Sequence, residues 1–182
     1  MFWRPAAALL IGILAGVACI ASLPFIRSRQ SDLFARTESY YRYPITVRDW
    51  AVKLRRDSFG KGYFGASRNG GRTHQVVDLS LDVHMPVFAA KSGRVVVAGV
   101  GKGYGKYVEI RHPDGRSSRY AHLSELCCVR GDWVERGRVI GVSGKTGNAA
   151  DRRIRPHLHF EILLNGKPMN PAVLLDPAVK MG

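Results

Sequence analysis

Cysteine is scarce in this sequence, which contains only Cys19, Cys127 and Cys128. Cys19 lies in an apolar segment, and a bridge between the two adjacent cysteines would be strained. A framework of disulfide bonds is therefore not expected. The adjacent pair also has no second cysteine pair to join, so the sequence gives no support to a zinc site made of thiolates.

Acidic residues are also in short supply, with 14 Asp and Glu against 28 Lys and Arg and a formal net charge of +14. Such an excess of positive charge favours an anionic partner, which could be nucleic acid, acidic lipid or an anionic polymer. No recognisable nucleic-acid-binding module accompanies the charge. We therefore do not expect nucleic acid to be the partner.

Charged residues are missing altogether from residues 5–26. As a helix with a rise of about 1.5 Å per residue, this segment reaches roughly 33 Å, enough to cross a bilayer core of about 30 Å. We predict that residues 1–29 form an N-terminal transmembrane helix and that residues 30–50 form a tether with a short helix. A cleaved signal is the alternative, because Gly16-Val17-Ala18 has the small-x-small pattern of a cleavage site.

Helical periodicity is weak beyond residue 45, where short apolar runs rich in β-branched residues alternate with glycine-rich turns. Many short strands at close spacing predict a mostly antiparallel, all-β domain, which we place at residues 51–182. The expected strands are 45–47, 50–52, 76–81, 87–88, 95–97, 107–110, 139–142 and 158–164.

The most informative segment is Pro156 to Glu161, in which His157 and His159 are separated by one residue. In a strand, alternate residues project from the same face, so both imidazoles should point into one site while Leu158 and Phe160 face the core. Two neighbouring imidazoles repel each other when protonated and are naturally held neutral by a metal ion. Glu161 shares their parity and is either a partner that holds an imidazole or a surface carboxylate at the strand end.

Two further segments offer polar groups of the same kind. His74 and Asp78 are separated by an even number of residues in a valine-rich segment, so they should share a face if that segment is extended. The third segment is Tyr120-Ala121-His122. Two imidazoles, one carboxylate and one open position are typical of a catalytic zinc site, whereas four protein ligands are typical of a structural one.

Taken in order, these segments resemble the lysostaphin/LytM-type zinc metallopeptidases, which cut peptide bonds in bacterial peptidoglycan. The resemblance is strongest over residues 72–175. It is carried by Arg72-Thr73-His74 to Asp78, Gly103-Tyr104-Gly105, Tyr120-Ala121-His122-Leu123, Gly131-Asp132-Trp133-Val134, Gly137-Arg138-Val139-Ile140-Gly141 and Pro156 to Glu161.

The resemblance implies a β-sheet domain of the duplicated-hybrid-motif type that holds one Zn²⁺ ion. It implies His74, Asp78 and His159 as the metal ligands, and His122 and His157 as the catalytic pair. Zinc would activate water and polarise a carbonyl group, while the two catalytic histidines would transfer protons or stabilise the developing oxyanion. Which of the two histidines does which stays open.

The expected function is that of a zinc-dependent endopeptidase that hydrolyses stem peptides or cross-bridges of peptidoglycan during cell-wall remodelling. The chain would be anchored to the cytoplasmic membrane with its catalytic domain outside. The alternative is a non-catalytic, peptidoglycan-binding regulator that activates a partner wall hydrolase. That alternative predicts a missing ligand, and none is missing.

Two features depart from the family pattern. Val76 stands where a small residue is usual, and the stretch before the histidine pair is expanded over residues 149–155. The expansion should reshape one wall of the cleft and so affect substrate preference. Its arginines either contact stem-peptide carboxylates and anionic envelope polymers or form a solvated loop; they are Arg152, Arg153 and Arg155.

Overall fold

The computed structural model describes residues 37–67 and 71–182. These residues form thirteen strands and two short 3-10 helices. The strands are β1 (Ala51–Val52), β2 (Arg56–Asp57), β3 (Gly60–Lys61), β4 (Val77–Ser80), β5 (Pro86–Phe88), β6 (Gly93–Gly101), β7 (Gly105–Arg111), β8 (Arg116–Leu126), β9 (Trp133–Val134), β10 (Val139–Ser143), β11 (His157–Leu164), β12 (Lys167–Met169) and β13 (Lys180–Met181). The 3-10 helices are η1 (Gly147–Ala150) and η2 (Pro171–Val173).

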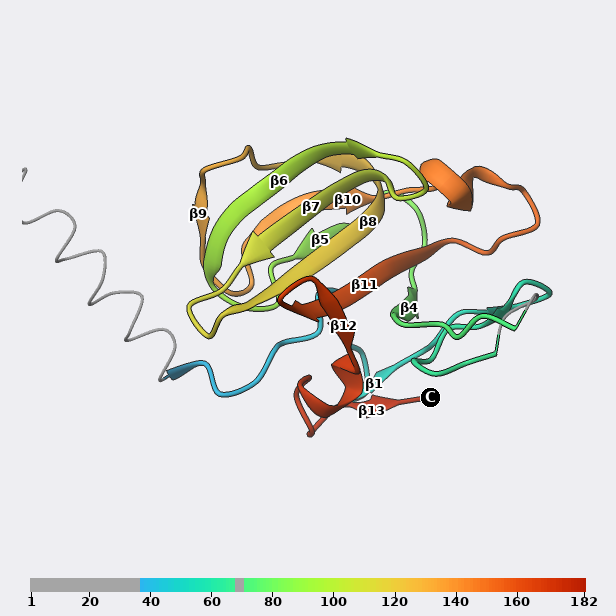
Figure 1. Ribbon diagram of the computed structural model, residues 1–182. Helices are drawn as coiled ribbons and strands as arrows, with labels where there is room; N and C mark the ends of the chain where they lie inside the picture. Colours follow the sequence, from blue (N-terminus) through green and yellow to red (C-terminus); the bar gives the residue numbers. More distant parts are fainter. Residues whose placement is uncertain (1–36, 68–70) are drawn as a thin grey trace, which may run out of the picture. The chain divides into compact units, whose positions relative to one another are not determined.

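The predicted all-β, mostly antiparallel fold is confirmed. Nine strands form one sheet in the order β12-β11-β8-β7-β6-β9, with β10 paired to β8 and β5, and β4 paired to β11. Figure 1 shows β6, β7 and β8 side by side in this sheet. Among the strands of the described residues, only β1 and β13 pair in parallel.

The predicted membrane anchor at residues 1–29 lies outside the described residues. Within residues 37–67 and 71–182, no helix is both long and apolar enough to cross a membrane.

The expected strand at residues 45–47 is not formed. Pro44 has no N–H to donate to a ladder, although its carbonyl accepts a 2.8 Å hydrogen bond from the Phe88 N–H. Ile45 is nevertheless buried and belongs to the hydrophobic core. Apolar character at residues 45–47 therefore reflects burial of an irregular segment and not a strand.

The strand that carries the predicted histidine pair has neighbouring strands on both sides. β11 is hydrogen-bonded to β8 along one edge and to β4 and then β12 along the other. As predicted, Leu158 and Phe160 face the core, where both side chains are fully buried, and the Phe160 ring lies 5.3 Å from that of Tyr120. Burying each such apolar side chain stabilises the fold by about 1.5–3 kcal/mol. The histidines on the opposite face are thereby held in place.

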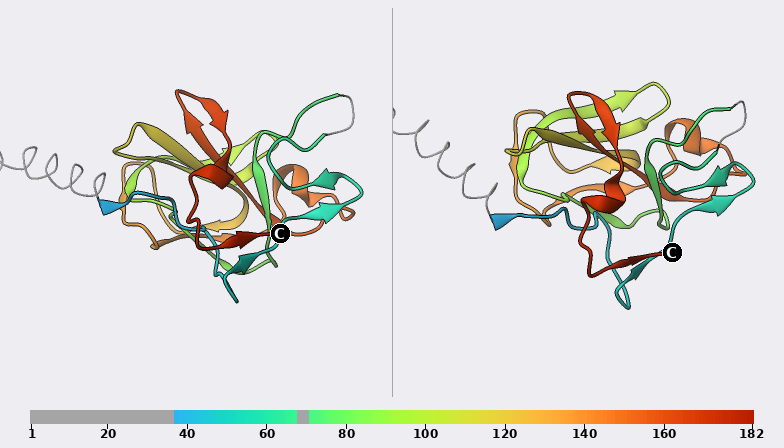
Figure 2. Two further views of the ribbon diagram at one scale, coloured as in Figure 1. Left: turned by 90° about the horizontal axis from the view of Figure 1, so that it is seen from below. Right: turned by 60° about the horizontal axis from the view of Figure 1, so that its bottom comes forward.

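A second part of the chain lies beside this strand. The hairpin of β2 and β3 follows β1 in the chain. Figure 2 shows it on the same side of the molecule as the loop after η1. Its backbone is tied to β4, because the Arg55 N–H donates to the Asp78 carbonyl at 2.9 Å and the Asp78 N–H donates to the Gly62 carbonyl at 2.8 Å. These bonds bring the side chains of the hairpin next to those of β4.

His112, which precedes a Pro-Asp-Gly turn, is a buried structural histidine. Its Nδ1–H donates to the Ser92 carbonyl at 3.0 Å, and Nε2 lies 2.8 Å from the Ser118 hydroxyl. That hydroxyl is hydrogen-bonded to the Tyr120 hydroxyl, which accepts from the Ala90 N–H. Burial lowers the pKa of His112 to about 4.

Acidification is therefore expected to weaken the fold through His112. Since its pKa is about 4 when folded and about 6.5 when unfolded, the unfolded chain binds more protons between these values. The contribution is fully present above pH 6.5 and is lost as the pH falls to about 4, amounting to roughly 3 kcal/mol. Urea unfolding at pH 7 and pH 4.5 measures this loss. His112→Asn, which cannot titrate, should lose less stability than wild type over this range, and equal losses would contradict the prediction.

Candidate metal centre

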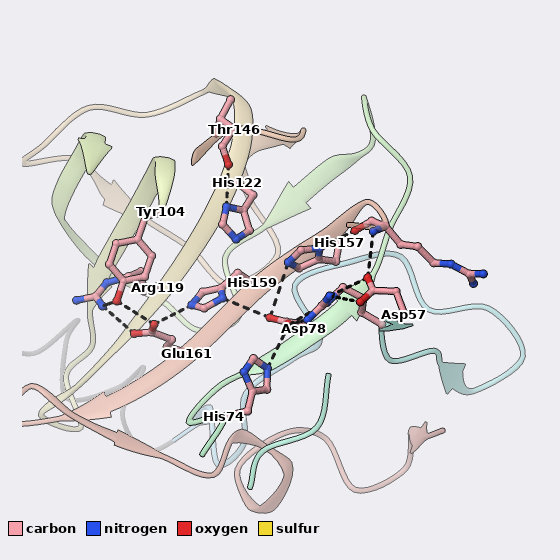
Figure 3. A network of polar contacts seen from close by, with 12 residues as sticks. Asp57, His74, Asp78, Tyr104, Arg119, His122, Thr146, His157, His159 and Glu161 are labelled. Atoms are coloured by element: carbon pink, nitrogen blue, oxygen red, sulfur yellow. Dashed lines mark hydrogen bonds and ion pairs between the residues drawn. The ribbon is translucent and has the colours of Figure 1, made fainter. Parts of the chain in front are cut away.

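The sequence-predicted site residues come together at one place in the structure (Figure 3). Asp78 lies in β4 directly opposite His159 of β11, and His157 precedes His159 by two residues on the same strand. His122 comes from β8, and His74 comes from the loop before β4. All five residues line a single cleft of about 610 Å³.

Asp78 is the centre of the cluster. Its Oδ2 lies 3.1 Å from His74 Nε2, and its Oδ1 lies 3.3 Å from His159 Nδ1. His157 Nε2 is farther away, at 3.9 Å from Oδ1. The His122 ring lies 5.0 Å from the His157 ring and 5.4 Å from the His159 ring, centroid to centroid. The carboxylate is thus closest to the two histidines that the resemblance implies as ligands.

Hydrogen bonds fix which nitrogen of His122 and of His157 faces the cleft. Nδ1 of His122 lies 2.9 Å from the Thr146 carbonyl, and Nδ1 of His157 lies 2.8 Å from the Arg155 carbonyl. Because a carbonyl oxygen can only accept, Nδ1 carries the proton in both rings. When each ring is neutral, Nε2 keeps its lone pair and can accept a proton in the cleft.

His159 is held in the opposite tautomer. Its Nε2–H donates to Glu161 Oε1 at 2.8 Å, which leaves Nδ1 facing Asp78. Glu161 also accepts from Arg119 at 2.7 Å and from the Tyr104 hydroxyl at 3.1 Å, and the glutamate is only 4% exposed. Of the two interpretations of Glu161, the partner that holds an imidazole is therefore the correct one, and the surface carboxylate is wrong.

The environment keeps His122 and His157 neutral. Burial, together with the neighbouring His159 and His157, lowers the pKa of His122 to about 3. Burial also lowers the pKa of His157, although Asp78 opposes this shift. Both rings are therefore unprotonated at neutral pH and available as proton acceptors.

His159 and the carboxylates beside it behave in the opposite way. Burial alone would lower the pKa of His159, but hydrogen bonds to Asp78 and Glu161 raise it to about 9. Burial would raise the pKa of Asp78, yet its contacts with His159 and His74 hold that pKa well below the usual value. The pKa of Glu161 is lowered by His159 and Arg119 in the same way. A cation that displaced the Nδ1 proton of His159 would meet the ionised Asp78, while Glu161 would still accept the Nε2–H.

The chemistry of these donors fits a zinc ion. Within the described residues, no three His, Cys, Asp or Glu side chains form a ready-made ligand cage; Asp78 instead contacts His74 and His159 directly. His74 Nε2 is buried and has no partner with hydrogen-bond geometry, despite its 3.1 Å approach to Asp78. Two imidazole nitrogens aimed at one carboxylate are the donor set that Zn²⁺ prefers.

The backbone at His122 takes an uncommon conformation, with φ of +65° in the left-handed region. Non-glycine residues adopt this region rarely and often at functional sites. The ring is held there because its Nδ1 bonds to Thr146, which itself packs against the tight turn at Gly105. At Gly105, a Cβ would lie 2.3 Å from the Thr146 hydroxyl, so only glycine fits.

Gly105→Ala is expected to destabilise the fold more than Gly115→Ala. Both glycines have positive φ, of +66° and +80°, but a Cβ at Gly115 would meet nothing within 4 Å. The control variant should lose about 1 kcal/mol from conformation alone, whereas Gly105→Ala should lose about 1–3 kcal/mol more from overpacking. Unfolding curves of both variants measure the difference. Equal losses would show that the close approach to Thr146 does not matter.

Several residues of the site have no role that the sequence alone reveals. Tyr104 was noted only as part of a glycine-flanked motif, and Arg119, Arg55 and Asp57 were not singled out at all. Arg119 contacts Tyr104 and also Glu109, at 2.8 Å. The glycines on both sides of Tyr104 are a signal for a sharp turn at the cleft, but isolated arginines carry no comparable signal.

The expanded segment at residues 149–155 runs beside the cleft. Ala149 and Ile154 line it, together with exposed cations contributed by Arg72 and Lys102. Arg153 forms a 2.7 Å ion pair with Asp151. The segment therefore forms one wall of the cleft, as the sequence predicted for the expansion.

Comparison with known proteins identifies the family of this chain. The model of peptidase family M23 matches residues 72–171. The chain is 38% identical over 110 residues to the DD-carboxypeptidase/endopeptidase Mpg of Neisseria meningitidis, a match that covers 60% of this chain and 24% of the relative. The chain thus spans about a quarter of the length of that relative.

Two solved structures are similar in fold to this chain. A zinc-containing peptidase from Vibrio cholerae superimposes with a TM-score of 0.59 and 29% identity, covering 73% of this chain and 39% of the other. The catalytic domain of the antimicrobial peptidase lysostaphin from Staphylococcus simulans gives a TM-score of 0.54 and 33% identity, covering 65% and 90%. Because the family model matches more than half of the residues of this chain, the chain belongs to peptidase family M23.

Proposed function

We propose that this protein is a zinc-dependent endopeptidase that hydrolyses peptide bonds of peptidoglycan stem peptides or cross-bridges. The observation that carries the proposal is the convergence of five side chains on one cleft. Four of them are histidines, and for His122, His157 and His159 a hydrogen bond to the outer ring nitrogen leaves the other nitrogen facing inward. Such an arrangement suits metal-assisted hydrolysis better than it suits binding alone.

In this proposal, His74, Asp78 and His159 hold one Zn²⁺ ion. The ion supplies Lewis-acid chemistry, activating water and polarising the scissile carbonyl group. His122 and His157 stay neutral near pH 7 and offer Nε2 as the proton acceptor or, once protonated, as the donor to the leaving amine. Glu161 keeps the His159 ring in the tautomer that presents Nδ1.

The wider setting is proposed on sequence grounds. Residues 1–29 would anchor the chain to the cytoplasmic membrane, residues 30–50 would act as the tether, and the metallopeptidase domain at residues 51–182 would face the cell envelope. The net charge of +14 would favour contact with anionic envelope polymers in addition to the peptide substrate.

Digestion of purified peptidoglycan tests the activity. The zinc-loaded protein should release fragments with new peptide termini and intact glycan strands, as identified by mass spectrometry, and a chelator should stop the release. The regulator alternative predicts a different pattern, in which the protein alone releases nothing but stimulates a partner wall hydrolase. Undiminished release in the presence of chelator would contradict the metal assignment.

A further inference from the structure

Arg55 is a buried cation at the edge of the candidate metal centre. Arg55 is only 5% exposed and directly precedes β2 in the chain. Its Nε donates to Asp78 Oδ2 at 3.1 Å, and its Nη2 lies 3.0 Å from the same oxygen. The guanidinium therefore binds Oδ2 of Asp78, which faces away from His159. Oδ1 remains on the side of His157 and His159.

The other side of the guanidinium is held by Asp57. Arg55 Nη1 lies 2.7 Å from both oxygens of that carboxylate. Asp57 Oδ2 also accepts a 3.1 Å hydrogen bond from the Arg155 N–H. The carbonyl of the same residue, Arg155, accepts the Nδ1–H of His157 at 2.8 Å. One ion pair is thus connected to both Asp78 and His157 (Figure 3).

The backbone leaves Arg55 little freedom to move away. Its N–H donates to the Asp78 carbonyl at 2.9 Å, and its carbonyl accepts from the Gly62 N–H at 2.8 Å. A planar guanidinium can bridge two carboxylates with separate N–H groups, whereas a lysine ammonium acts as a single point of charge. The two carboxylates also leave the trio with one net negative charge, so a cation at Asp78 is not opposed by an excess of positive charge.

We propose that Arg55 and Asp57 are a positioning pair that orients the metal ligand Asp78 and the proton-transferring His157 together. Arg55 sets the direction of the Asp78 carboxylate. Asp57 anchors Arg55 and also holds the backbone at Arg155. The Arg155 carbonyl in turn fixes the tautomer and the orientation of the His157 ring. The inference rests on the proposed zinc peptidase function and adds to it two residues outside the family motifs quoted above.

The test measures zinc affinity and turnover separately in the full-length protein. Arg55→Lys keeps the charge but loses the fork, and it should weaken zinc binding by about 10–100-fold in a chelator competition assay. Asp57→Asn should lower kcat on peptidoglycan peptides by about 10–100-fold and change KM by only about 2-fold, because His157 loses its orientation and not its contact with substrate. Arg116→Lys is the matched control, since Arg116 pairs with Asp114 away from the cleft, at 3.3 Å.

Circular dichroism melting would show that each variant is folded before its zinc affinity is compared. The proposal is overturned if Arg55→Lys binds zinc as tightly as Arg116→Lys does and Asp57→Asn has the same kcat as Arg116→Lys. It is also overturned if the free-energy losses caused by the two changes are additive. Two residues that act as one positioning pair should give a double variant that is little worse than either single variant. If wild type binds no zinc, the proposed function fails together with this inference; if wild type binds zinc and only the variants are indifferent, the inference alone fails.

Discussion

His157→Ala is expected to retain zinc while turnover falls by about 10²–10⁴-fold, the range for losing one positioned proton-transfer group. His157 Nε2 lies 3.9 Å from Asp78, beyond the 3.3 Å at which His159 approaches the same oxygen. Its lowered pKa keeps the ring neutral and ready to accept a proton. Metal analysis of the purified variant and a cross-link cleavage assay measure the two quantities.

His84→Asn provides the control for this variant. His84 is exposed, and its φ of +65° lies in a region that asparagine tolerates better than alanine does. The control should keep zinc content, melting temperature and turnover close to those of wild type. If His157→Ala cleaves as fast as the control, then His157 is not part of the reaction.

His159→Ala is expected to lose zinc altogether under conditions in which His157→Ala keeps it. In the proposed site this change removes a ligand and not a positioning contact, so the loss of zinc affinity should exceed the roughly 10–100-fold cost of removing an outer partner. The ligand-linked part of stability should vanish too, which is about 4 kcal/mol when zinc is present at 1,000 times its Kd. Zinc titrations followed by melting curves would measure both effects.

The result should be specific to the ring and its charge partners. His159 contacts Asp78 through one ring nitrogen and Glu161 through the other, so its removal takes a shared partner from two buried carboxylates. Even without added zinc, His159→Ala should therefore melt below His157→Ala. Zinc loss in His157→Ala together with zinc retention in His159→Ala would reverse the two roles.

The histidine pair and its strand could be predicted because alternation is a local property. His157, Leu158, His159 and Phe160 alternate between the cleft and the core as expected. Contact between His74 and Asp78 was also expected, but for a different reason. The chain bends at Val76 and β4 begins only at Val77, so the bend and not a shared strand face brings His74 to the carboxylate.

The longest strand escaped prediction. β8 begins at Arg116 and runs to Leu126, and its first half is a polar run of Arg and Ser. Those residues pair through polar side chains: Ser118 contacts His112, 6 positions away, and Arg119 contacts Glu109 and Glu161, 10 and 42 positions away. Polar side chains that are held by such pairs leave no alternating apolar pattern, which was the signal used to predict the strands.

The same limit explains why Arg55 and Asp57 were not predicted. Arg55 precedes Asp78 by 23 positions, and Asp57 precedes Arg155 by 98. Neither lies in a motif, and each looks like an ordinary charged residue of a loop. Only the packing of the β2–β3 hairpin beside β4 gives them a place at the site.

The pairing of β11 on both edges also affects how fast the backbone opens around the cleft. His159, Phe160 and residues 162–164 have strand partners on both sides, so exchange of their amides with solvent deuterium requires extensive unfolding. The two-residue strands β2 and β3 pair only with each other. One wall of the cleft, which carries His159, should therefore open slowly. The β2–β3 hairpin should open faster at its turn, although its Arg55 end is tied to Asp78 by backbone hydrogen bonds, and a cation held by Asp78 would slow the opening of that end.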